Sequence, residues 1–157
     1  MLISPTIWSF VAGAALFFIV SLVFIYQGHT GRESSLRRGA DTAIWAVVLI
    51  CGIYIGLAIV NDLHVYARVE LIFNGVLIAT LVIMRWQGVS QRLAFAILLI
   101  GLHGLWDVLH LFELPLANDL VPSWYAWTCG ILNFGYFLLA LPIFITIMRF
   151  GRVTNNK

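Results

Sequence analysis

Charged residues are scarce in this sequence: Asp, Glu, Lys and Arg make up 10% of its 157 residues. A soluble domain typically contains about 25% charged and about 45–50% apolar residues, whereas 62% of this chain is hydrophobic. A soluble fold of this length could not bury so much apolar surface, and intrinsic disorder requires the opposite composition. The composition therefore excludes both a cytosolic enzyme domain and a disordered chain.

Residues with reactive side chains are also few. The single lysine, Lys157, follows the last apolar stretch, so no retinal-type Schiff base can form within a membrane span. Cys51 and Cys129 form no CxxC pair, which argues against thiol–disulfide chemistry. The sequence has no phosphate-binding loop, HExxH or GxSxG motif. With nine Lys and Arg against seven Asp and Glu, its charge is too balanced for a nucleic-acid partner.

Long apolar stretches are what the sequence does contain. A helix needs about 20 apolar residues to cross a bilayer, and five stretches meet that requirement, at about 7–26, 42–60, 63–84, 93–112 and 124–148. We therefore predict one all-α membrane domain over residues 1–157, a bundle of five transmembrane helices in contact with membrane lipids. Ser4 before Pro5, Asp41, Asp62 and Ser123 are the expected helix caps, and Pro142 is expected to kink the last span.

The positive charges predict the orientation. Arg68 is the only basic residue in or beside the connection that follows the second span or the fourth; all the others follow the first, third or fifth span. The positive-inside rule then places the N-terminus outside and the C-terminus inside. The segment 27–41 is expected to be a polar inner connector. We expect the membrane to be the bacterial cytoplasmic (inner) membrane.

Ionisable residues within the spans are the main functional signal, because each costs about 2.5–3.5 kcal/mol near the bilayer centre. His103, Asp107 and His110 have the spacing i, i+4, i+7 and share one face of the fourth span. Glu70 and Asn74 share a face of the third span. The fifth span carries a further polar stripe, Cys129, Asn133 and Tyr136.

Depth predicts which of these groups can meet. At about 1.5 Å per residue, Asp107, Glu70 and Cys129 lie about 8–10 Å below the outer surface, and His103, Asn74 and Asn133 about 13–16 Å below it. His110, with His64, Asp62 and Glu113, is expected at the mouth. Gly101 and Gly104 are expected to leave room beside His103, and Gly52 and Gly56 form a GxxxG pattern that favours helix packing.

We interpret this pattern as an outward-facing polar pocket between spans three, four and five that binds a small ligand or an ion. The predicted ligand-binding residues are His103, Asp107, His110, Glu70, Asn74, Asn133 and Trp106. A binding role is favoured over catalysis, and no catalytic residue is assigned.

Two alternatives stay open. The chain could be an accessory or assembly subunit of a larger membrane complex, or a homo-oligomer, with the polar cluster joining its helices. It could instead be a membrane-embedded metal-dependent enzyme, with the metal ion held by His103, Asp107, His110 and Glu70. His103 and His110 are about 10 Å apart along a straight helix, so these two could not both bind one ion.

Overall fold

Five long helices make up the computed structural model of this chain, which describes residues 5–29, 33–60, 65–112 and 121–150. The helices are α1 (Pro5–His29), α2 (Glu33–Val60), α3 (Val65–Met84), α4 (Val89–Leu111) and α5 (Ser123–Phe150). All five are long and apolar enough to cross a membrane. The chain is therefore an all-helical protein with five membrane spans, as the sequence predicts.

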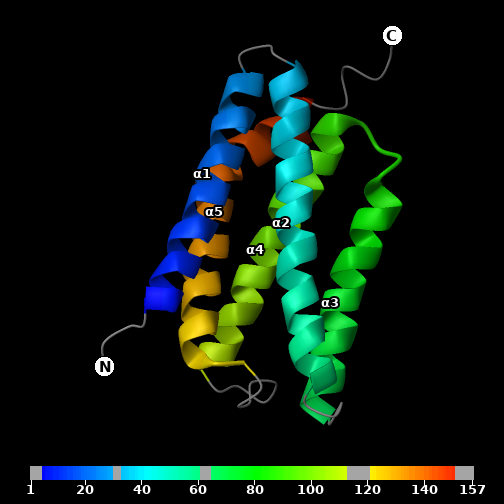
Figure 1. Cartoon of the computed structure of the whole chain (residues 1–157). Helices are drawn as coiled ribbons and strands as arrows, with labels where there is room; N and C mark the ends of the chain where they lie inside the picture. The colour runs from blue at the N-terminus through cyan, green and yellow to red at the C-terminus, as the bar shows by residue number, and fades with distance from the viewer. Residues whose placement is uncertain (1–4, 30–32, 61–64, 113–120, 151–157) are drawn as a thin grey trace.

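Successive helices run in opposite directions, so the bundle has two chemically different ends (Figure 1). We call the end where α1, α3 and α5 finish the basic end. Among the described residues it carries Arg37, Arg38, Arg85, Arg92 and Arg149. Arg68 lies in the first turn of α3, at the opposite end. The structure thus separates the basic residues along the bundle axis as the sequence pattern requires.

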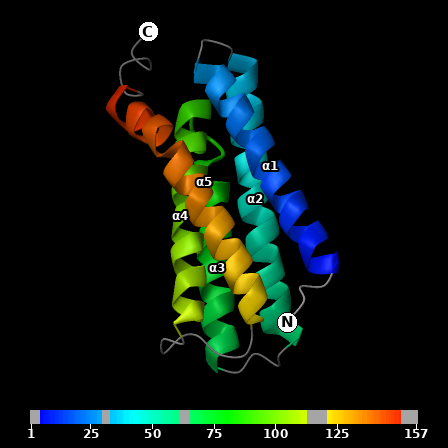
Figure 2. The ribbon, with the colours of Figure 1, turned by 90° about the vertical axis from the view of Figure 1, so that its left-hand side faces the viewer.

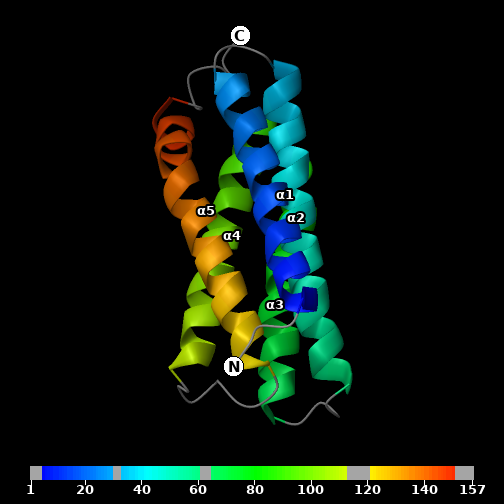
Figure 3. The same cartoon turned by 60° about the vertical axis from the view of Figure 1, so that its left-hand side comes forward.

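Helix α4 is the central element of the site described below. It packs most extensively against α5 and also contacts α2 and α3, while α1 covers α2 and touches α5. Figure 3 shows α1 and α2 side by side, with α5 and α4 beside them. Among the described residues α3 and α5 do not contact each other. The predicted meeting of spans three, four and five therefore takes place around α4, which contacts both α3 and α5.

The predicted polar connector 27–41 is wrong, because α1 continues to His29 and α2 begins at Glu33. Glu33 and Arg37 form an i,i+4 ion pair at 3.5 Å, which supports helix on this polar segment. A Cβ on Gly28 would lie 2.6 Å from the backbone N of Leu36. The glycine therefore lets α1 and α2 approach closely at this end, and the contact extends both helices beyond their apolar stretches.

The predicted helix starts also change. Asp41 is not a cap but an interior residue of α2, with its carboxylate 4.0 Å from the guanidinium of Arg92 on α4. Ser123 is the first residue of α5, whose first backbone hydrogen bonds end on the carbonyl of Pro122. Pro5 is the first residue of α1, whereas Ser4 and Asp62 lie outside the described residues.

Pro142 lies inside α5, and the helix continues through it. Figure 2 shows the last part of α5 leaning away from the axis of the rest of that helix. Proline cannot donate a backbone hydrogen bond and displaces the carbonyl one turn earlier. The Tyr26 hydroxyl of α1 donates to the carbonyl of Leu139 at 3.0 Å, so a neighbouring helix bonds the backbone near the distortion.

Candidate functional site

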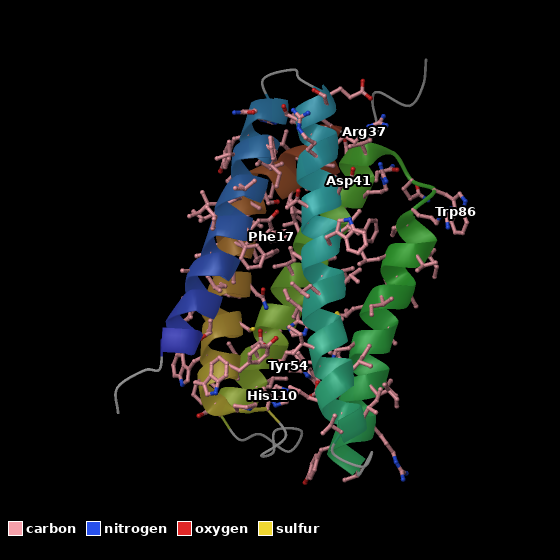
Figure 4. All side chains as sticks on the ribbon, in the orientation of Figure 1. Phe17, Arg37, Asp41, Tyr54, Trp86 and His110 are labelled. Carbon is pink, nitrogen blue, oxygen red and sulfur yellow. The ribbon has the colours of Figure 1, made fainter. Side chains whose placement is uncertain are left out.

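A cluster of polar side chains lies inside the bundle, in the part farther from the basic end. Figure 4 shows two of its residues, Tyr54 and His110, toward the end opposite Arg37 and Trp86. Four helices contribute to what we call the polar cluster: Tyr54, Glu70, Asn74, His103, Trp106, Asp107, His110 and Asn133. Glu70, Asn74, His103, Asp107 and Asn133 are each at most 1% exposed. The chain is thus a five-span membrane protein with buried ionisable groups.

Two glycines of α4, Gly101 and Gly104, let α5 approach closely. A Cβ on Gly101 would lie 2.6 Å from the ring of Phe137, and one on Gly104 would lie 2.9 Å from the backbone N of Phe134. Both glycines therefore make room for α5, rather than for the His103 imidazole as expected from the sequence. Close contact with α5 brings Asn133 to the edge of the cluster.

Asp107 is the carboxylate of the cluster that contacts side chains of several helices. The Tyr54 hydroxyl of α2 donates to its Oδ1, and Asn133 Nδ2 of α5 donates to its Oδ2 at 3.0 Å. His103 Nδ1, one helical turn away, lies 3.4 Å from the same Oδ2. A single carboxylate on α4 therefore joins side chains from three helices.

The contacts of Asn74 define the donor and acceptor roles of His103. Asn74 Nδ2 donates to Glu70, both to its backbone carbonyl at 2.9 Å and to Oε2 at 3.2 Å. Its Oδ1 therefore faces His103 Nε2, at 3.1 Å, and accepts from it. Asp107 Oδ2 lies 3.4 Å from the other ring nitrogen, Nδ1, so His103 bridges Asn74 and Asp107.

Glu70 is the second carboxylate and lies on α3. Trp106 Nε1 donates to both of its oxygens, at 2.9 and 3.0 Å. The Trp106 ring is held by stacking on Phe73, with centroids 4.1 Å apart and planes 12° apart. Glu70 therefore has a fixed position at the contact between α3 and α4.

His110 is the exception in the cluster. Its side chain is 4% exposed, and its Nε2 lies 2.7 Å from Oε1 of Glu70. Despite this short distance, neither ring nitrogen makes a hydrogen bond to the described residues. The other cluster residues each make at least one hydrogen bond. A buried imidazole without hydrogen bonds is uncommon and calls for an explanation.

The structure brings together the seven residues predicted for the site, in an arrangement that partly differs from the predicted depths. His103 contacts Asn74 as predicted. Asn133, predicted at the same depth as these two, instead donates to Asp107, which was predicted to lie nearer the outer surface. His110 lies within ion-pair distance of Glu70. Its expected neighbours at the mouth, His64, Asp62 and Glu113, lie outside the described residues.

Tyr54 is not among the predicted site residues, because the polar stripes in the sequence lie on the third, fourth and fifth spans and Tyr54 lies on the second. It lies six residues before the end of α2 at Val60, which is about 9 Å at the helical rise. That is the depth predicted for Asp107, so depth is the signal in the sequence that identifies Tyr54.

A metal centre finds no support in the geometry. Within the part of the chain that the structure describes, no three His, Cys, Asp or Glu side chains are grouped so that they could hold a metal ion. The polar atoms of His103 and Asp107 are instead hydrogen-bonded to Asn74, Tyr54 and Asn133. No family model, curated protein or solved structure matches this chain.

Proposed function

We propose that this protein binds a small ligand at the His110 end of the polar cluster, from the outer side of the membrane. The observation that supports the proposal is the His110 imidazole, which is buried, lies within ion-pair distance of Glu70 and has no hydrogen bond to any residue that the structure describes. A ligand with a hydrogen-bonding group would complete this position.

The energetics favour a role beyond helix packing. Hydrogen bonds between membrane helices average only about 0.6 kcal/mol, whereas an ionised carboxylate within the bilayer costs about 2.5–3.5 kcal/mol. Two carboxylates and two imidazoles are therefore a costly way to hold helices together. Intramembrane ionisable groups typically mark a binding site or an ion path.

The charges of the cluster indicate which ligand would fit. In this proposal His103 is an imidazolium and Asp107 a carboxylate, so their charges cancel. The remaining charge is that of the Glu70 carboxylate, which lies beside His110. If His110 is neutral, one of its ring nitrogens is an open acceptor and the cluster keeps the one negative charge of Glu70. A small cation with N–H donors, such as a protonated amine, would donate to the open acceptor of His110 and balance the negative charge. The basic residues at the far end support an outer location for this site, by the positive-inside rule.

The test is thermal stabilisation of the protein in lipid nanodiscs by defined probes: ammonium, methylammonium, sodium, potassium, magnesium and zinc ions. A ligand that binds only the folded protein raises its stability in proportion to its saturation. We expect methylammonium or ammonium to raise Tm, His110→Phe to abolish the shift, and His29→Phe to keep it. His29 is an exposed histidine at the basic end, so it is a matched control.

The remaining outcomes would favour the two other interpretations. If none of the probes raises Tm and a stoichiometric partner protein co-purifies in mild detergent, the chain is an accessory subunit. If only zinc raises Tm, and elemental analysis finds one metal per chain that is lost in His103→Ala, the metal-dependent interpretation replaces ours.

A further inference from the structure

A second feature of interest is a cavity between α1, α2 and α5. Its volume is about 330 Å³, which is within the range of about 300–1,000 Å³ usual for ligand pockets. Gly13 and Leu49 lie at its exposed rim, and Leu49 is 62% exposed. Most of its walls are apolar, with Phe17, labelled in Figure 4, and Phe18 from α1.

The inner wall of the cavity is different in character. Tyr125, Cys129 and Asn133 of α5 line it, and each is at most 6% exposed. Asn133 also donates to Asp107 at 3.0 Å. The cavity therefore ends on buried polar groups and reaches the polar cluster at Asn133.

The lining and the setting together restrict what can enter. A cavity with apolar walls does not hold water stably, and its exposed rim lies on spans that face lipid. A fully apolar molecule would make no hydrogen bond with the Asn133 amide on the inner wall. A fully polar molecule could not enter through apolar walls.

We propose that this cavity binds a lipid-soluble molecule with an apolar chain and one hydroxyl or carbonyl group. The chain packs against α1 and α2, and the polar group contacts Asn133 on α5. The site is open to the bilayer and does not depend on the ligand proposed at His110.

The probe for this proposal is a ten-carbon alcohol that carries a photoreactive diazirine, added to the protein in lipid nanodiscs. After illumination, mass spectrometry locates the adducts. We expect saturable labelling of cavity residues such as Phe17, Ile50 and Leu132. Excess decanol should reduce it at least fivefold, and decane at the same membrane concentration at least threefold less effectively.

Two glycines provide a matched pair of variants. A Cβ on Gly13 or on Gly135 would meet nothing within 4 Å, but only Gly13 lines the cavity. Gly13→Leu should reduce the labelling at least fivefold, and Gly135→Leu should change it less than twofold. Leu49→Trp at the rim is a second blocking variant in case Gly13→Leu does not fold.

Labelling that does not saturate, spreads over lipid-facing residues such as Ile19 and Ile72, or is equal in Gly13→Leu and Gly135→Leu would overturn the proposal. Equal displacement by decane would overturn its polar part. The variant His110→Phe separates the two sites: retained labelling supports an independent cavity, and lost labelling in a protein of unchanged Tm would contradict it.

Discussion

His103 and Asn74 are 29 positions apart in the sequence, and Nε2 of the histidine lies 3.1 Å from Oδ1 of the amide. This contact fixes the position of α3 along α4, although α3 and α4 pack against each other much less extensively than α4 and α5 do. It also orients both side chains, because the amide nitrogen of Asn74 is already bonded to Glu70. The two carboxylates of the polar cluster are thereby joined through an amide and an imidazole.

Asp107→Asn should be strongly destabilising. The substitution places an amide where Tyr54, Asn133 and His103 need an anionic acceptor. Removing one partner of a buried ion pair usually costs about 3–5 kcal/mol. The free energy of unfolding in mixed micelles measures the loss.

Glu33→Gln is the control for that prediction. Glu33 also pairs with a basic residue one turn away, but the side chains of Glu33 and Arg37 are 80% and 60% exposed. Exposed pairs contribute about 0–1 kcal/mol. Equal effects of the two substitutions would show that Asp107 is not the junction of the cluster.

Tyr54→Phe and Tyr136→Phe each remove one buried hydroxyl group. Tyr54 donates to the Asp107 carboxylate, whereas the Tyr136 hydroxyl bonds that of Ser21 at 2.9 Å. Hydrogen bonds to charged groups contribute about 1.5–3 kcal/mol and neutral ones about 0.5–1.5 kcal/mol. We expect the larger drop in unfolding free energy for Tyr54→Phe, and the reverse order would refute the assigned role of Asp107 as its acceptor.

Gly104→Ala tests the close contact between α4 and α5. The added methyl group would lie 2.9 Å from the backbone N of Phe134, which cannot move without shifting the helix. Overpacking of this kind costs about 1–3 kcal/mol. Gly135→Ala, with open space around its Cβ, should instead gain up to about 1 kcal/mol of helix stability. A thermal melt of both variants decides whether this contact is as close as described.

The orientation can be tested by cysteine labelling from outside the cell. Cys51 and Cys129 are buried, so a new cysteine reports alone when a membrane-impermeant maleimide is added to bacteria that express the protein. Ser123→Cys should be labelled in intact cells and Gln87→Cys only after lysis. The opposite pattern would place the His110 end of the cluster on the inner side.

The number and class of the helices were predictable because the apolar runs have the length that a bilayer requires. The polar site residues were also predictable, since His103, Asp107 and His110 repeat at helical spacing. The extension of α2 back to Glu33 was not, because it depends on a tertiary contact between α1 and α2 at Gly28.

Packing also decides which glycines lie at contacts between helices. Gly52 and Gly56 form the GxxxG pattern, yet a Cβ on either would meet nothing within 4 Å. Gly101 and Gly104, which follow no such pattern, are the ones that contact α5. Sequence spacing gives the face of a helix on which a residue lies, but the helix that packs on that face depends on the whole bundle.

The most direct test of the central claim is the ¹⁵N spectrum of the histidine side chains in nanodiscs. Substitution of His29 and His64 by Gln leaves two reporters. Within the described parts of the chain, His103 is hydrogen-bonded on both ring nitrogens and His110 on neither. Our account predicts that His103 shows two protonated nitrogens and stays unchanged when methylammonium is added, while the His110 signals shift to a saturating value. A shift of His103 alone, or no shift of His110 at any concentration, would contradict it.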